Sequence, residues 1–208
     1  MTPPPRTLVT SLRDGTPVLI RPVVPEDARL LREGFERLSD VSRYQRFLHP
    51  VRELTAAQLR YFTEIDYRDH MAWVAVDLSQ PSRPGVGIAR YIRFPHRRNA
   101  AEVAVTVVDA HQGTGLGTLL LGMLARSAVE NRIDTWVAEV LTENTAMLNL
   151  FRDLGAHDAR LQEGGVVQVE IPVPRDPSQL PETPAGKVFR AVAQQVGVRQ
   201  LSVPTGSR

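Results

Sequence analysis

The chain has 208 residues, with 25 Lys and Arg against 23 Asp and Glu, and it contains no cysteine. A net charge of +2 gives little support to nucleic-acid binding. The absence of cysteine excludes disulfides, thiolate metal ligands and an acyl-cysteine intermediate. The length fits one ordinary domain with an extension. Because no apolar run approaches the roughly 20 residues that span a bilayer, and the proline-rich N-terminus lacks an apolar signal core, we expect a cytoplasmic protein that binds no membrane.

The first third of the chain predicts one strand and two helices after a flexible N-terminus over residues 1–12. The strand is expected over residues 18–21 and ends at Pro22. A helix is expected to begin at Pro25, because proline suits the first helical position and the acidic residues that follow suit the positive end of a helix. A capping box from Thr55 to Gln58 predicts the second helix. The apolar residues at helical spacing behind these two starts are Leu30, Leu31, Phe35, Leu38, Leu59, Phe62 and Ile65.

The remaining pattern predicts an α+β domain with a mixed, mostly antiparallel sheet flanked by helices, extending over residues 13–172. Residues 173–208 are expected to be a proline-rich linker followed by a short helix near residues 187–196 and a loose end. Gly164 and Gly165 suggest a hairpin turn between the last two strands. The expected strands cover residues 71–78, 86–94, 101–108, 135–141, 158–161 and 166–171, and the expected helices cover residues 119–133 and 145–154.

A glycine-rich turn between a strand and a long helix is the strongest local motif. Such a turn gathers backbone N–H groups into a concave patch, and the helix N-terminus adds about half a positive charge, so the patch suits a pyrophosphate without any lysine. A Walker A loop is excluded because no lysine is near, and a Rossmann fingerprint is excluded because Thr118 replaces its third glycine. A glycine loop without a ligand is the alternative. The pattern that fits is Gln/Arg-x-x-Gly-x-Gly/Ala, with Gln112, Gly115 and Gly117.

This turn and the later segment from Glu139 to Ala156, EVLTENTAMLNLFRDLGA, resemble the two motifs of the GNAT acetyltransferase superfamily. The resemblance covers roughly residues 13–172. Four shorter motifs resemble, more narrowly, the catalytic domain of bacterial protein lysine acetyltransferases that modify acyl-CoA synthetases. They are Leu12-Arg-Asp-Gly15, Ile20-Arg-Pro22, Ser42-Arg-Tyr-Gln-Arg-Phe47 and Ile65-Asp-Tyr67.

The resemblance implies a GNAT-like fold that takes acetyl-CoA as co-substrate. It assigns Asn144 to the neighbourhood of the pantetheine arm or the thioester. Many members carry a tyrosine at the position of Phe151 to protonate the leaving thiolate, which phenylalanine cannot do, so water or a donor such as Tyr44 or Tyr91 would have to replace it. The implied pyrophosphate-binding residues are Gly113, Thr114, Gly115, Leu116, Gly117 and Thr118, and the implied pantetheine-binding strand edge is Val105, Thr106 and Val107.

The acceptor amine needs a base, because deprotonating a lysine ammonium at pH 7 costs about 4.6 kcal/mol and a nearby carboxylate can take the proton. Glu102 is the first candidate. Strand alternation puts it with Ala104, Thr106 and Val108 on one face, opposite an apolar face of three valines. The resemblance agrees, because this subfamily places its base at the start of this strand. The alternatives are an exposed strand-end glutamate without a role, and Glu139 on the next strand as base or water-holder.

We expect a ternary complex in which the amine attacks the thioester directly, because the chain offers no cysteine for a covalent intermediate. The first choice of acceptor is a lysine on a protein, for example an acyl-CoA synthetase. A small amine, an N-terminal amine and a non-catalytic acyl-CoA-binding regulatory module are the alternatives. Arg43 and Arg46 are candidates for the acceptor groove. The histidines lack metal-ligand spacing, so no metal is expected.

Overall fold

The computed structural model describes residues 6–194 and shows one eight-stranded sheet in the order β1-β2-β3-β4-β5-β6-β8-β7. Within the described residues β5 and β6 pair in parallel and every other neighbouring pair is antiparallel. The predicted mixed, mostly antiparallel sheet is therefore confirmed. The strands are β1 (Leu8–Ser11), β2 (Pro17–Pro22), β3 (His70–Asp77), β4 (Gly85–Arg93), β5 (Ala100–Val107), β6 (Thr135–Leu141), β7 (His157–Leu161) and β8 (Val166–Pro172).

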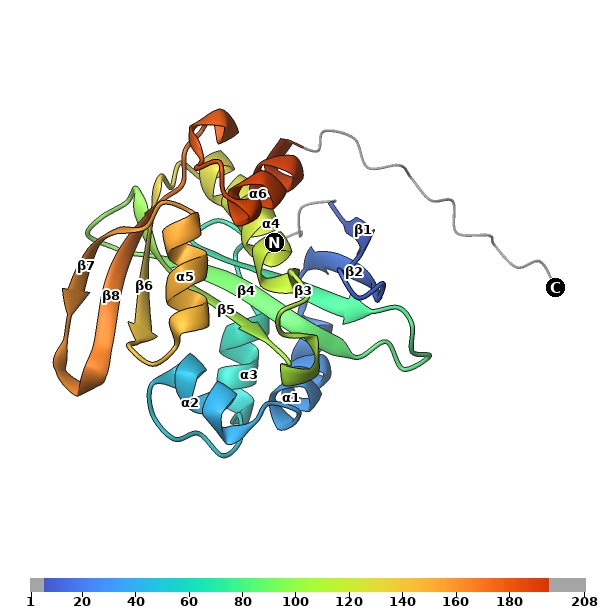
Figure 1. Ribbon diagram of the computed structural model, residues 1–208. Coiled ribbons are helices and arrows are strands. Elements are labelled where there is room, and N and C mark those ends of the chain that lie inside the picture. Colours follow the sequence, from blue (N-terminus) through green and yellow to red (C-terminus); the bar gives the residue numbers. More distant parts are fainter. Residues whose placement is uncertain (1–5, 195–208) are drawn as a thin grey trace.

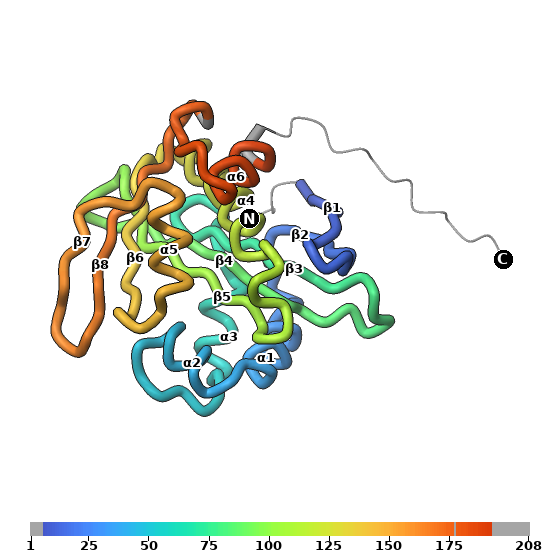
Figure 2. The backbone as a smooth tube through the Cα atoms, in the orientation of Figure 1, coloured from blue at the N-terminus to red at the C-terminus, as the bar shows by residue number. Residues whose placement is uncertain are grey.

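Helices cover both faces of this sheet, as Figures 1 and 2 show. Three short helices lie on one face, and the longest helix, α4, packs across β3, β4 and β5 on the other. Because both faces are covered, β3 is buried along almost its whole length. The helices are α1 (Ala28–Glu36), α2 (Asp40–Phe47), α3 (Ala56–Thr63), α4 (Leu116–Glu130), α5 (Thr145–Asp153) and α6 (Pro184–Gln194).

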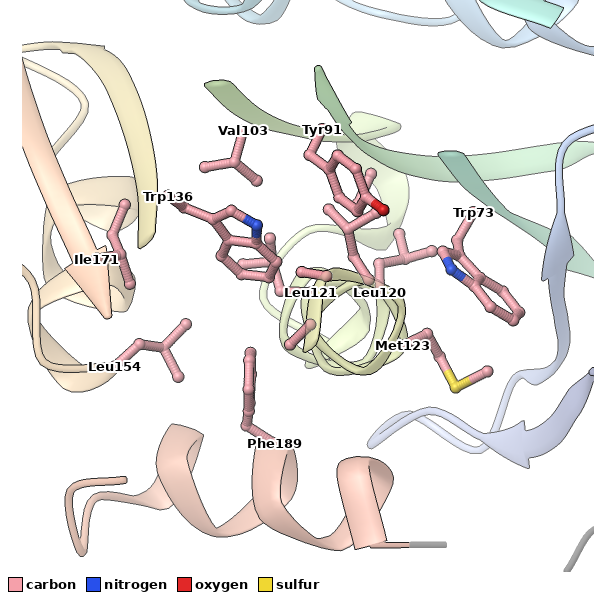
Figure 3. Close-up of a cluster of buried hydrophobic side chains, with 14 of the residues drawn as sticks. Trp73, Tyr91, Val103, Leu120, Leu121, Met123, Trp136, Leu154, Ile171 and Phe189 are labelled. Atoms are coloured by element: carbon pink, nitrogen blue, oxygen red, sulfur yellow. The ribbon is translucent and has the colours of Figure 1, made fainter. Parts of the chain in front are cut away.

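The C-terminal segment is part of the domain rather than a separate tail. Helix α6 begins three residues before the expected start and packs against α4. Phe189 is 3% exposed, and its ring meets the ring of Trp136 edge-on at 6.3 Å between centroids. Figure 3 shows Phe189 pointing from α6 into the core that surrounds α4. Because these apolar side chains are buried in the core, the structure does not place a domain boundary after residue 172. The expected end of the helix, residues 195–196, and the expected loose end lie outside the described residues.

Part of the N-terminal segment differs from the expectation of a flexible stretch over residues 1–12, of which residues 1–5 lie outside the described residues. Leu8–Ser11 form the edge strand β1, which pairs with β2, and Leu12 is buried in the main core. Helix α2 was not predicted from the sequence, although Ser39 caps it by accepting a hydrogen bond from the backbone N–H of Ser42. The helix predicted over residues 119–133 begins earlier, at Leu116, directly behind the glycine turn.

The parallel pair β5–β6 is short, and this opens the sheet. The two strands are paired only where residues 100–102 face residues 135–137. Glu102 and Val137 form the last pair, after which the strands separate. The separated edges of the two strands border the cleft described below.

Candidate active site

A cleft of ≈ 660 Å³ lies where β5 and β6 separate. Its walls come from α2, β5, the glycine turn, the first turn of α4, β6 and α5. The structure brings together in this cleft all the predicted catalytic and cofactor-binding residues except Thr114. Those that line it are Glu102, Val105, Thr106, Val107, Gln112, Gly113, Gly115, Leu116, Gly117, Thr118, Glu139 and Asn144.

The glycine turn ends in the uncapped N-terminus of α4. Gly113 and Gly115 have φ values of 74° and 90°, in the left-handed region that favours glycine. No side chain from residues 6–194 caps the first turn of α4, and the first N–H groups of a helix have no partner within it. Together with the positive end of the helix dipole, these N–H groups form an anion-binding end of the cleft.

Two side chains just before the glycine turn, those of Gln112 and Asp109, hold the anion-binding end of the cleft in place. The side-chain amide of Gln112 donates to the hydroxyl of Ser42 and to the carbonyl oxygen of Val107, both at 3.1 Å. The carboxylate of Asp109 accepts from the backbone N–H and hydroxyl of Ser39 and from the hydroxyl of Ser42. Burial acts to raise the pKa of Asp109, but these hydrogen bonds prevail and lower it. Gln112, predicted as a cofactor-binding residue, therefore ties the end of β5 to α2.

Arg13 is a cleft residue that the sequence did not assign to the site. It lies in the turn between β1 and β2, and its backbone N–H donates to the carbonyl oxygen of Thr114 at 3.2 Å. Its Nε atom lies 3.5 Å from the position that a Cβ of Gly115 would occupy. The Thr114 hydroxyl donates to the carbonyl oxygen of His111 at 2.6 Å, which turns that side chain into the loop. A cation therefore lies beside the anion-binding end, supplied by a segment that is distant in sequence.

Both candidate bases lie on the same face of the sheet, one on each side of the opening. Val103 is in the core against α4, so Glu102 points to the other face. Trp136, Ala138 and Val140 belong to the same core, so Glu139 also points away from α4. Both glutamates are exposed and line the cleft. Strand alternation thus supports either residue as a carboxylate that an acceptor amine can reach.

Arg46 brings a cation to this carboxylate region. It lines the cleft from α2, and it lies close enough to Glu102 for the two charges to interact. Burial lowers the pKa of Arg46, and the charge of Glu102 opposes that shift. Arg43, the other candidate for the acceptor groove, is used differently: its guanidinium donates to the carbonyl oxygens of Phe35 and Glu36 and stacks on the Phe35 ring. Arg43 therefore joins α1 to α2.

Near the expected thioester position lies Asn144, the residue that caps helix α5, and none of the described tyrosines lies there. Asn144 caps α5, since its side-chain oxygen accepts from the backbone N–H of Met147 at 3.1 Å. Phe151 is 2% exposed beside the cleft. Tyr91 is buried elsewhere, where its hydroxyl donates to the carbonyl oxygen of Arg68 and burial raises its pKa. Tyr44 is absent from the cleft lining, and no tyrosine of the described residues takes part in it.

Comparison with known proteins decides the family. The model of the acetyltransferase (GNAT) domain matches residues 18–157. This chain belongs to the GNAT acetyltransferase family. It is 39% identical to acetyltransferase Pat of Mycolicibacterium smegmatis over 163 aligned residues. These residues make up 78% of this chain and 48% of the relative. It is 37% identical over 147 residues to acetyltransferase PA5475 of Pseudomonas aeruginosa, covering 71% of this chain and 78% of the relative.

The solved structures agree with this assignment. The GNAT domain of S. lividans PAT matches with a TM-score of 0.72 and 34% sequence identity, covering 80% of this chain and 96% of that chain. The chain spans about half the length of the M. smegmatis relative. The chain thus carries a GNAT acetyltransferase domain, and the predicted GNAT-like fold is confirmed.

Two further findings concern the described residues only. No helix among residues 6–194 combines the length and the apolar character that crossing a membrane requires. Within the same part of the chain, no three His, Asp or Glu side chains are grouped so that they could hold a metal ion.

Proposed function

We propose that this GNAT protein transfers an acetyl group from acetyl-CoA to the side-chain amine of a lysine on another protein. The observation that carries the proposal is the cleft between β5 and β6, which has an anion-binding helix end at one side and two carboxylates at the other. In this arrangement the pyrophosphate binds the N–H groups behind Gly113 and Gly115. The pantetheine arm lies along the free edge of β5 at residues 105–107, and the thioester reaches the level of Glu102.

The reaction is a direct attack within a ternary complex. Glu102 accepts a proton from the ammonium, the free amine attacks the thioester carbon, a C–N bond forms and the C–S bond breaks. Glu102 is preferred over Glu139 as the base because it lies in the last β5–β6 pair, at the point where the cleft opens. Glu139, two residues beyond the last β5–β6 pair, is assigned to holding a water. Because Phe151 offers no proton, the second proton that the nitrogen loses as the amide forms reaches the thiolate through water.

A protein acceptor is favoured over a small amine by the relatives. The M. smegmatis and S. lividans proteins carry the names acetyltransferase Pat and PAT, and the chain is 39% identical to the first over 78% of its length. The exposed Tyr44 on α2 and Tyr61 on α3 belong to the helices that cover the face of the sheet opposite α4. Aromatic side chains of this kind are common where proteins bind one another. An acyl-CoA synthetase is one example of such an acceptor.

The test is acetyl-CoA turnover, followed by thiol release, against a panel of bacterial proteins and small primary amines. Mass spectrometry of the products should find acetyl groups on lysine Nζ atoms. Turnover with small amines alone would replace the protein acceptor by a small molecule. Tight acetyl-CoA binding without turnover on any acceptor would contradict catalysis and favour a regulatory acyl-CoA-binding module.

A further inference from the structure

A second cavity, of ≈ 80 Å³, lies between the sheet and helices α1, α2 and α3. Its volume exceeds the roughly 10–15 Å³ that one water needs. It adjoins the cleft, because Arg46, Phe47 and Thr106 line both. Among the described residues, only Arg46, Arg90 and Thr106 bring polar side chains to it. Its apolar walls are Leu30, Leu31, Phe35, Leu38, Phe47, Leu54, Phe62, Val74, Ile88 and Val108.

Arg90 is a buried cation in this cavity without a carboxylate partner. The residue is 5% exposed, and none of its nitrogens lies within 4.0 Å of a carboxylate oxygen of the described residues. Its contacts are neutral: the guanidinium lies 4.2 Å from the centroid of the Phe62 ring, and Nη1 lies 3.2 Å from Nε2 of His70. Burial and the charge of Arg90 lower the pKa of His70 to about 4, so this imidazole is neutral at pH 7.

Two more groups in the cavity lack the partner that their chemistry requires. Arg46 stacks on the Phe47 ring at 5.0 Å. Among the described residues it forms no ion pair within 4.0 Å, and the charge of Glu102 acts on it from a greater distance. The hydroxyl of Thr106 is buried and has no hydrogen-bond partner in the part of the chain that the structure describes. Burial and the positive charge of Arg46 lower the pKa of Arg90 to about 9, which leaves Arg90 charged at pH 7. A buried guanidinium is costly unless an anion compensates it, so the cavity has a place for a carboxylate that the described chain does not fill.

We propose that this cavity receives the far end of a short dicarboxylic acyl chain carried on coenzyme A, such as succinyl, with its carboxylate bound by Arg90, Arg46 and the Thr106 hydroxyl. The apolar walls fit the methylene groups, the guanidinium fork fits the carboxylate, and the shared residues connect the cavity to the cleft. The inference rests on the proposed function of that cleft. The transfer step is the same: the amine nitrogen binds the thioester carbon, the C–S bond breaks, and the far carboxylate is unchanged.

The test compares kcat/KM for acetyl-, butyryl- and succinyl-CoA on one lysine acceptor, for the wild-type protein and Arg90→Met. Methionine keeps much of the apolar stem but removes the charge. We expect the wild type to use succinyl-CoA. Arg90→Met should lower the ratio of kcat/KM for succinyl-CoA to kcat/KM for acetyl-CoA about 10- to 100-fold, as loss of a charge-assisted hydrogen bond does. The butyryl-to-acetyl ratio should change by no more than a few-fold. Arg46→Met, at the mouth of the cavity, should shift the succinyl ratio in the same direction, whereas Arg32→Met on the exposed face of α1 should not.

Three results would overturn the proposal. One is a wild type that uses acetyl-CoA and rejects succinyl-CoA. Another is a folded Arg90→Met whose succinyl-to-acetyl ratio is unchanged. The third is an Arg90→Met that instead raises KM for free amino acids as acceptors, because the cavity would then bind the acceptor's carboxylate. If no thioester is turned over, the proposed function fails by itself, and calorimetry decides the cavity: succinyl-CoA should bind more tightly than butyryl-CoA, and Arg90→Met should remove that difference.

Discussion

Gln112 and Ser42 are joined by a hydrogen bond of 3.1 Å from the side-chain amide to the hydroxyl. This contact links the coenzyme motif to a helix that lies 70 residues earlier in the chain. The motif's glutamine thereby orders the glycine turn from inside, because it also holds the last carbonyl of β5. Binding of the coenzyme should depend on this support even though the amide is already occupied.

Gln112→Ala removes both hydrogen bonds of this support. We expect the free energy of unfolding to fall by about 1–2 kcal/mol, the net worth of two such bonds, and Kd for acetyl-CoA to rise about tenfold. Ser42→Ala should act in the same direction, because it also removes a donor from Asp109. Ser82→Ala, in the exposed loop between β3 and β4, is the control. Calorimetry and thermal unfolding measure both effects, and an unchanged Kd for Gln112→Ala would show that the turn orders itself without this support.

Gly115→Asp should abolish tight coenzyme binding. An aspartate would put a negative charge at the anion-binding end, and unfavourable charge pairs of this kind cost several kcal/mol, so Kd for acetyl-CoA should rise at least about 100-fold. Because Gly115 has a φ of 90°, any side chain there also strains the backbone. Gly15→Asp is the matched control, with a φ of 88° and nothing within 4 Å of its Cβ position. Equal losses of affinity in the two variants would contradict the pyrophosphate assignment.

Phe189→Ala tests whether the C-terminal helix belongs to the fold. The ring is 3% exposed and packs on Trp136, so its truncation should lower the free energy of unfolding by about 3–5 kcal/mol. Lys187→Ala, exposed on the same helix, should stay within about 0.5 kcal/mol. Denaturant titration measures both values. Similar small changes for the two variants would mean that α6 docks only loosely.

His70 should make the protein less stable in mild acid. Burial first, and then the charge of Arg90, lower its pKa from 6.5 to about 4, while Asp66 opposes the shift. The unfolded chain therefore binds a proton that the folded protein refuses between about pH 6.5 and pH 4. The free energy of unfolding should fall as the pH drops through this window. His70→Gln keeps an acceptor for Arg90, so its stability should fall less with decreasing pH in thermal unfolding scans. Identical pH profiles for the variant and the wild type would contradict the lowered pKa of His70.

The sheet and the turn could be predicted from the sequence because their signals are local. Period-2 alternation in β5, Gly113 and Gly115 before an apolar helix, and the capping box at Thr55 each act within a few residues. The rest depends on contacts between distant segments. Leu8–Ser11 is too short to show a period and becomes a strand through β2, and Phe189 follows a proline-rich stretch typical of a linker but is buried against β6.

The candidate site shows the same division. The residues of the glycine turn and both glutamates could be identified from spacing and family resemblance. Arg13 could not, because its role depends on a turn between β1 and β2 that packs on Thr114, about 100 residues later in the sequence. The buried arginines of the second cavity could not be predicted from the sequence either. Only the assembled fold shows that Arg90 has no carboxylate partner among the described residues.

The most direct test of the account is kcat for Glu102→Gln beside Glu139→Gln, measured with saturating acetyl-CoA and a lysine acceptor. Glutamine keeps the shape of Glu102 but accepts no proton there, so kcat should fall about 10²- to 10⁴-fold. Kd for acetyl-CoA should hardly change, and higher pH should restore part of the activity because more of the amine is then neutral. Glu139→Gln should retain most of its activity. If Glu139→Gln loses its activity and Glu102→Gln keeps it, the base is Glu139 on β6. Full activity in both variants would contradict catalysis by either carboxylate.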